Sequence, residues 1–244
     1  MAFPISRRNF LALTAVSLAT PLLRATSADK ISAVPADLDH ILLGVSDLDH
    51  GIAWFEQRSG VRAVIGGVHP GRGTRNALAS LGPRRYLEII APDPQQAGTP
   101  ASREEWAARL AALQEPRLIG WAAHTFDLVA VAKAAKTAGM AIDEPRDGSR
   151  SRPDGKVLRW KSFGLKDDRD GMLPFFIEWS RDTVHPSQDA PQGCKLLSFS
   201  AESPSAEQLA SDARKLGLGF DVKRGKSPQF HARILGQKGE SDLS

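Results

Sequence analysis

Two glutamates lie inside short apolar stretches, where a charged side chain is unusual. Glu88 belongs to the stretch YLEII and Glu178 to the stretch FFIEW. A carboxylate that is buried without a partner is costly, so each must meet a cation, a hydrogen-bond donor or water. We therefore predict that both face a cleft and act as catalytic residues. The alternative is that each faces solvent on the open side of its strand.

A glycine-rich segment, residues 69–76 (HPGRGTRN), lies between two strand-like stretches. It is not a phosphate loop, because it lacks the Gly-Lys-Ser/Thr ending and no helix follows it. The plain alternative is a hairpin turn. The chain has no Gly-x-Ser-x-Gly elbow, and Cys194 has no activating context, so nucleophilic hydrolysis is not indicated.

The stretch that contains Glu88 belongs to a unit with the predicted order βαβββ. Residues 38–45 form a short apolar run typical of a buried strand, Asp47 is placed to cap a helix, and Gly60 is placed to end it. Glycine and proline then separate three further strand-like runs, at 61–66, 76–81 and 86–90.

The same order begins again at residue 118. A strand at 120–126 is followed by the capping residue Asp127, and Gly139 ends the helix. Predicted strands follow near 140–142, 157–163 and 174–179. A weaker third copy starts at 195–200, but the chain stops where its fourth strand should form.

We therefore predict modules at 36–91 and 118–181, a helical connector at 92–117 and a partial third βαββ repeat within 182–244. The stretches that carry a family resemblance are LDHILLGVSDL (38–48), HPGRGTRN (69–76), YLEII (86–90), GWAAHTFDL (120–128), FFIEW (175–179) and HPSQDAPQGCKL (185–196). Together they resemble the glyoxalase-like domain of the vicinal oxygen chelate superfamily. The resemblance implies an α+β fold, in which paired βαβββ modules form a curved mixed sheet around a cleft that often holds a divalent metal ion.

The resemblance also implies site residues. Metal-binding members take one ligand from the first strand of a module and another from its last strand, which correspond here to His40 and Glu88. With Glu178 these would supply one imidazole and two carboxylates, a set that suits Mn, Fe, Co or Zn and leaves positions open for substrate oxygens. No nucleotide cofactor is expected. The alternative for His40 is a structural histidine.

The second module departs from the family pattern. The position that matches His40 is Gly120, which cannot ligate a metal, and His124 lies four residues further on, roughly 13 Å along a strand. His124 therefore cannot simply replace the missing ligand. We expect it to contact substrate, together with the polar residues of the glycine-rich segment: His69, Thr74 and Asn76.

The segment at residues 1–28 resembles a twin-arginine export signal. Arg7 and Arg8 precede an apolar stretch, 11–23, which is shorter than the roughly 20 residues that span a bilayer. Cleavage after Ala28 would give a periplasmic or secreted protein that had used the twin-arginine translocase and kept no permanent membrane anchor. The alternatives are an ordinary secretory signal and an uncleaved anchor.

Removal of residues 1–28 takes away three arginines and no acidic residues. It leaves 29 basic residues against 28 acidic ones and a net charge of about +1, which argues against a nucleic-acid partner. Cys194 is the only cysteine, so an intramolecular disulfide is excluded. A homodimer is left open.

The sequence thus leads to two hypotheses. The first is an exported enzyme of the lyase, isomerase or dioxygenase type, which uses a divalent metal ion to hold a small oxygen-rich substrate. The second is a non-catalytic protein that binds or sequesters a small molecule in the same cleft. The paired glutamates favour the first, and the glycine at position 120 favours the second.

Overall fold

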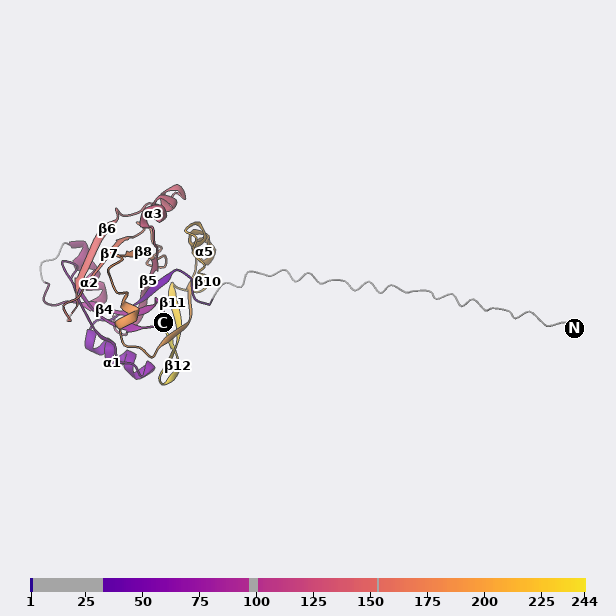
Figure 1. Ribbon diagram of the computed structural model, residues 1–244. Coiled ribbons are helices and arrows are strands. Elements are labelled where there is room, and N and C mark those ends of the chain that lie inside the picture. Colours follow the sequence, from indigo (N-terminus) through magenta and orange to yellow (C-terminus); the bar gives the residue numbers. More distant parts are fainter. Residues whose placement is uncertain (2–32, 97–100, 153) are drawn as a thin grey trace. The chain divides into compact units, whose positions relative to one another are not determined.

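The computed structural model describes Met1 and residues 33–96, 101–152 and 154–244, with the backbone alone at 101–104. Contacts divide the chain into two units, Met1–Lys30 and Ile31–Ser244. Apart from Met1, the predicted export signal lies outside the described residues. The second unit carries all the named helices and strands (Figure 1).

The first module has the predicted βαβββ order. The side chain of Asp47 accepts a hydrogen bond from the backbone N–H of His50 and so caps the helix, and Gly60, with a φ of 76°, ends it. Its elements are β1 (Leu38–Gly44), α1 (Leu48–Ser59), β2 (Val64–His69), β3 (Thr74–Ser80) and β4 (Tyr86–Pro92).

The second module follows the predicted helical connector, and one of its strands differs from the prediction. Residues 140–142 form only an isolated bridge, from Ile142 to Leu165, and the strand lies instead at 146–151. That segment, RDGSRS, is polar throughout and lacks the apolar alternation that indicates a strand. The elements are α2 (Ala101–Ala111), β5 (Arg117–His124), α3 (Leu128–Thr137), β6 (Arg146–Ser151), β7 (Val157–Phe163) and β8 (Phe175–Trp179).

The two modules share one curved sheet of eight strands, in the order β2-β3-β4-β1-β5-β8-β7-β6. In each module the first strand pairs in parallel with the last, and β1 and β5 join the modules by antiparallel pairing. The curvature brings the edge strands β2 and β6 together. A Cβ atom added at Gly67 would lie only 2.7 Å from the backbone oxygen of Ser151.

Side chains alternate between the two faces of this sheet. On the convex face, Ile41 and Leu87 belong to the main hydrophobic core. On the concave face, His40 and Glu88 line a cavity. The predicted curved α+β sheet around a cleft is therefore confirmed.

The C-terminal segment differs from the predicted partial repeat in two respects. A fourth strand is present, and the small sheet has the order β10-β9-β11-β12, so that the strand after the helix pairs in parallel with the first. In the two modules, by contrast, the strand that pairs in parallel with the first strand is the last one. The elements are α4 (Pro186–Asp189), β9 (Lys195–Ser203), α5 (Ala206–Lys215), β10 (Asp221–Arg224), β11 (Gln229–Gly236) and β12 (Gly239–Leu243).

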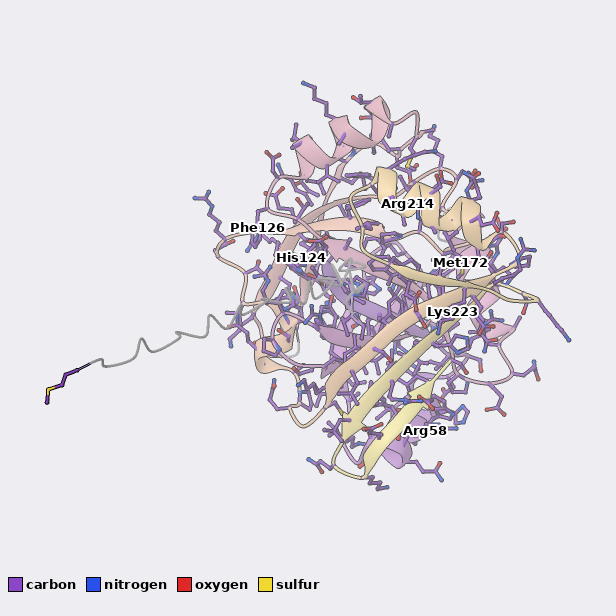
Figure 2. All side chains as sticks on the ribbon, turned by 90° about the vertical axis from the view of Figure 1, so that its right-hand side faces the viewer. Arg58, His124, Phe126, Met172, Arg214 and Lys223 are labelled. Carbon is purple, nitrogen blue, oxygen red and sulfur yellow. The ribbon has the colours of Figure 1, made fainter. Side chains whose placement is uncertain are left out.

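The small sheet packs on the same hydrophobic core as the large one. Trp121 of β5 contacts Phe199 and Phe220, with ring centroids 5.7 and 5.0 Å apart. In Figure 2 the orange and yellow strands of the small sheet face the viewer. In the part of the chain that the structure describes, no helix is long and apolar enough to cross a membrane.

Candidate functional site

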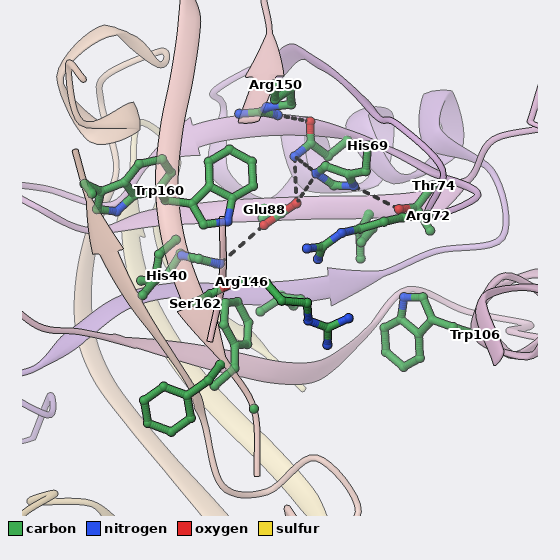
Figure 3. A pocket seen from close by; sticks show the side chains of 18 of the residues that line it. His40, His69, Arg72, Thr74, Glu88, Trp106, Arg146, Arg150, Trp160 and Ser162 are labelled. Atoms are coloured by element: carbon green, nitrogen blue, oxygen red, sulfur yellow. Dashed lines mark hydrogen bonds and ion pairs between the residues drawn. The ribbon is translucent and has the colours of Figure 1, made fainter. Parts of the chain in front are cut away.

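The concave face of the large sheet encloses a cavity of about 450 Å³ (Figure 3). This volume lies within the usual range for small-molecule sites. The first module contributes the imidazoles, a carboxylate and an amide, and the second module contributes mainly aromatic side chains and arginines. Among the side chains that line the cavity are His40, His69, Asn76, Glu88, Arg150 and Trp160.

Glu88 stands between two imidazoles on the polar side of the cavity. Nε2 of His40 lies 3.3 Å from its Oε2 atom, and Nε2 of His69 lies 3.3 Å from its Oε1 atom. The three side chains come from β1, β2 and β4 of the first module. The structure thus brings together His40 and Glu88, as predicted for metal ligands, and adds His69.

An amide and a guanidinium also fix the carboxylate. Nδ2 of Asn76 donates to Oε1 of Glu88 at 2.6 Å, and Nη1 of Arg150 donates to Oδ1 of Asn76. Burial by itself would raise the pKa of Glu88, but the hydrogen bond from His69 and the charges of His69, His40 and Arg150 hold it well below its usual range. Glu88 therefore stays ionised.

Asp39 orients His40 from behind. Its Oδ1 atom accepts a hydrogen bond from Nδ1 of His40 at 2.7 Å, although neighbours in a strand normally face opposite ways. A β-bulge explains this: Leu38 pairs with Ala123 and His40 with Ala122, so Asp39 is the extra residue. Because a carboxylate can only accept, the hydrogen is on Nδ1, and Nε2 of His40 points at Glu88.

Two further donors complete the surroundings of Asp39. Its Oδ2 atom accepts from Nε1 of Trp179 at 3.0 Å and from Nε2 of His185 at 3.1 Å. Nδ1 of His185 in turn accepts from the backbone N–H of Ser187. Burial would raise the pKa of Asp39, but the hydrogen bonds from His185 and His40 and their charges lower it well below its usual range.

Thr74 and Tyr86 hold the two imidazoles on their other sides. Nδ1 of His69 lies 2.8 Å from Oγ1 of Thr74, and the ring of Tyr86 stacks on His40 with centroids 4.5 Å apart. Burial, followed by the negative charges of Asp39 and Glu88, raises the pKa of the Tyr86 phenol well above its usual value. The phenol therefore stays neutral.

The side chains around Glu88 are of the types that bind divalent metal ions. Both imidazoles turn Nε2 toward one carboxylate, and both are held through Nδ1 by a polar partner, as metal-ligating histidines usually are. The 3.3 Å separations match the roughly 3.0–3.4 Å between adjacent ligands whose metal bonds are about 2.1 Å. Each imidazole faces a different carboxylate oxygen, and among the described residues no group of three or more His, Cys, Asp or Glu side chains is arranged to hold a metal ion.

Glu178 does not share this site, contrary to the prediction. Its Oε2 atom accepts a hydrogen bond from the backbone N–H of Leu128 at 2.7 Å, at the start of α3, and the cavity is lined instead by its neighbours Ile177 and Trp179. The predicted pair of carboxylates and the ligand set that contains Glu178 are therefore wrong. Side chains alternate along a strand, so a shift of one residue moves the carboxylate to the other face.

His124 also lies away from the cavity. Its ring contacts Phe126, with centroids 5.7 Å apart, at the end of β5, where Figure 2 labels both residues. Burial lowers the pKa of His124, and the charge of Arg84 lowers it further. Of the four residues predicted to bind substrate, the structure brings His69, Thr74 and Asn76 to the cavity and leaves His124 outside.

Sequence reasoning missed three residues of the site: Asp39, His185 and Arg150. Only Asp39 had a local signal: it is a carboxylate in an apolar stretch, next to His40, and a buried carboxylate needs a partner. Nothing local marks Arg150, because its segment reads as a polar loop. His185 is 146 positions from Asp39, so no spacing rule links them.

Comparisons with known proteins agree with this architecture. The profile of the glyoxalase-like domain matches residues 38–217. A hypothetical protein from Staphylococcus aureus has a similar structure, with 16% identity, a TM-score of 0.65, and coverage of 81% of this chain and 90% of that one. At this identity the likeness shows the fold alone.

Two methylmalonyl-CoA epimerase structures are more distant. The enzyme from Mycobacterium tuberculosis has 22% identity and a TM-score of 0.40, and covers 61% of this chain and 89% of that one. A variant from Streptomyces coelicolor has 21% identity and a TM-score of 0.42, with 61% and 97% covered. No curated protein matches the sequence. Because the glyoxalase-like profile covers most of the chain and the paired modules enclose a cleft, this chain belongs to the glyoxalase-like domain family of the vicinal oxygen chelate superfamily.

Proposed function

We propose that this protein is an exported, metal-dependent enzyme that acts on a small oxygen-rich substrate in the cleft of the large sheet. One observation carries the proposal: Nε2 atoms of His40 and His69 both lie 3.3 Å from the buried carboxylate of Glu88, on the polar side of the cavity. Three donors with outer partners favour a divalent cation over a purely structural cluster.

His40, His69 and Glu88 would hold the metal. When bound, the metal supplies Lewis-acid stabilisation of an enolate or a similar oxyanion on the substrate. With a metal bound, Asp39 would hold the remaining ring hydrogen of His40 on Nδ1 and leave Nε2 as the ligand. Because the pKa of Glu88 is held low, its carboxylate suits a ligand better than a general base, which needs a pKa near the working pH.

Asn76 contributes by position, since its amide donates to Glu88 and is itself held by Arg150. Aromatic side chains line the opposite side of the cavity. A lyase, an isomerase and a ring-cleaving dioxygenase could all use such a centre. The product formed from a substrate distinguishes these three reaction types.

The test is metal content together with metal-dependent stability. At a metal concentration of 100 Kd, binding adds about 2.7 kcal/mol, and each kcal/mol raises the Tm of a domain of this size by about 2–4 °C. We expect Mn²⁺, Fe²⁺, Co²⁺ or Zn²⁺ to raise the Tm by roughly 5–10 °C in the native protein, and not in H69A or E88Q.

E178Q is the matched control, because Glu178 carries the same charge on the opposite face of the sheet, and glutamine can still accept the hydrogen bond from Leu128. It should keep the full metal response. A native protein that contains no metal and shows no shift with any of the four ions would overturn the proposal. An equal shift in E88Q would place the metal elsewhere.

A specific observation supports the rival function, a non-catalytic binding protein. His40 pairs with Tyr86, two residues before Glu88, whereas in the second module Ala122 pairs with Phe175, two residues before Ile177. The second module thus offers apolar residues where the first has its donors. A ligand that binds the metal-free cleft and is recovered unchanged would favour this rival.

Export is proposed on the sequence of residues 6–11 (SRRNFL) and the apolar stretch after it. In a host with a working translocase, we expect the native protein in the periplasm or medium with a new N-terminus near Asp29. The R7K/R8K double variant should stay uncleaved in the cytoplasm, and equal export of both forms would contradict this route.

A further inference from the structure

Arg150 is a buried cation that forms no direct ion pair with a carboxylate among the described residues, and it reaches the carboxylate of Glu88 only through the amide of Asn76. It is 4% exposed, and its Nη1 atom donates to the neutral amide of Asn76. Within the described part of the chain, its Nε atom has no hydrogen-bond partner, and no carboxylate forms an ion pair with it. Because an unpaired buried charge is costly, the site favours an anion supplied from outside.

The backbone around Arg150 is shaped to admit this guanidinium. A Cβ atom at Gly66 would collide with Nη1 of Arg150 and with Oδ1 of Asn76. The glycine on β2 therefore lets the side chain of Arg150 from β6 enter the cavity, where Figure 3 shows it above Glu88. The charge is built into the cleft and does not lie at its surface.

A second arginine of β6 lies toward solvent. Arg146 is four residues from Arg150 on the same strand face and also lines the cavity, but its side chain is 63% exposed. Its nearest carboxylate in the described structure is Asp143, at 3.9 Å. Water screens such a group, so it attracts an anion only weakly and in a salt-dependent way.

The wall beside Arg150 is aromatic. Trp160 and Trp179 line the cavity with ring centroids 5.5 Å apart, and Phe175 lies beside them on β8. Gly148 makes room for the indole, since a Cβ atom there would collide with Trp160. The cleft therefore presents a cation next to a broad apolar surface.

We propose that the cleft binds a monocarboxylate, with the carboxylate on Arg150 and an aryl or branched apolar body against Trp160 and Trp179. The inference rests on the proposed function in using the same cleft, and it names the class of substrate. A planar carboxylate matches the fork of a single guanidinium. A phosphate dianion is less suitable, because its two negative charges exceed the single positive charge of Arg150.

The experiment is a titration followed by tryptophan fluorescence and calorimetry. The probes are phenylacetate and 3-phenylpropanoate, their neutral amides, and phenylphosphonate. We expect R150Q to raise the Kd of the carboxylates by about 10- to 100-fold and to change that of the amides by less than about 3-fold, since only a charged partner loses a charge-assisted pair. For the carboxylates, the Kd of R150K should lie between that of the native protein and that of R150Q.

R146Q is the matched control from the same strand, and it should change the Kd by less than about 3-fold, an effect that salt removes. The proposal is overturned if no carboxylate binds, if the amides bind as tightly, if phenylphosphonate is preferred, or if R150Q weakens all probes equally. The last result would mean that Arg150 only positions Asn76.

The result also separates this inference from the proposed function. In H69A, which is expected to lose metal binding, the carboxylate probes should still bind and still respond to R150Q. Carboxylate binding without any metal response would leave the substrate class standing while the metal enzyme fails. A metal response with no preference for carboxylates would support the metal enzyme and contradict the proposed substrate class.

Discussion

At the scale of single residues, the buried carboxylate of Asp39 fixes the orientation of His40. It accepts hydrogen bonds from His40, Trp179 and His185, and it is fully buried. A carboxylate offers about four acceptor positions and no donor, so it can serve all three partners at once. An asparagine in its place would turn an N–H group toward at least one donor.

We therefore predict that D39N lowers the free energy of unfolding by about 3–5 kcal/mol, the usual cost of removing one partner of a buried charged network. Urea unfolding measures this loss, and metal titration should show a weaker response, because His40 is no longer held. D49N, on the exposed side of α1, is the control and should change stability by less than about 0.5 kcal/mol. If D39N lost no more stability than D49N, the hydrogen-bond network around Asp39 would contribute little to the free energy of unfolding.

The low pKa of Glu88 predicts how stability depends on pH. Its pKa in the fold lies below the value of about 4.3 expected in the unfolded chain. The stabilisation is therefore complete above about pH 5 and is lost as the pH falls through 4 toward the folded pKa. Between pH 5 and pH 3, E88Q should lose less stability than the native protein, and E178Q should follow the native curve. Parallel curves for E88Q and the native protein would contradict the charge pairing of Glu88.

At the scale of elements, the site depends on two edge strands that approach each other. β2 brings His69 and β6 brings Arg150, and these strands lie at opposite ends of the sheet order. Curvature closes the distance, and Gly66 provides the space for Arg150. Each module alone would leave one side of the cavity open, so the cleft is a product of their pairing.

This packing predicts a specific effect of G66A. The added methyl group would push Arg150 and Asn76 apart, at a cost of about 1–3 kcal/mol for overpacking a close contact. Urea unfolding measures this loss, and a titration with 3-phenylpropanoate should show weaker binding than in the native protein. G219A is the control, since its Cβ atom would meet nothing within 4 Å. Unchanged binding in G66A would show that Arg150 does not reach the ligand through this gap.

At the scale of the whole molecule, the small sheet belongs to the same folding unit as the cleft. Phe199 of β9 stacks with Phe220 and Phe230 and contacts Trp121 of the large sheet. β1 and β5 thus have the cavity on one face and this aromatic cluster on the other. The small sheet supports the strands that carry His40 and Asp39.

We predict that F199A destabilises the protein by about 3–5 kcal/mol while leaving a single unfolding transition. Fluorescence and far-UV circular dichroism should give coincident curves, because the two sheets share one core. F126A is the control, since Phe126 is 78% exposed, and it should cost less than about 1 kcal/mol. Two separate transitions in F199A would mean that the small sheet unfolds on its own.

The sequence by itself determined features that depend on near neighbours. Apolar runs, helix caps such as Asp47 and terminating glycines such as Gly60 gave the two modules, since these signals act within a few residues. A carboxylate in an apolar run marked Glu88, because burial demands a partner wherever that partner comes from. The polar residues of the glycine-rich segment, by contrast, were assigned to the cleft only through the family resemblance.

Only the tertiary structure decided which side chains meet. A bulge against β5 turned Asp39 toward His40, and a strand position one residue out of phase sent Glu178 to the convex face. Arg150 reached the cavity because two distant edge strands approach each other. Bulges, strand phase and edge closure depend on pairing between segments far apart in the chain, and no local pattern encodes that pairing.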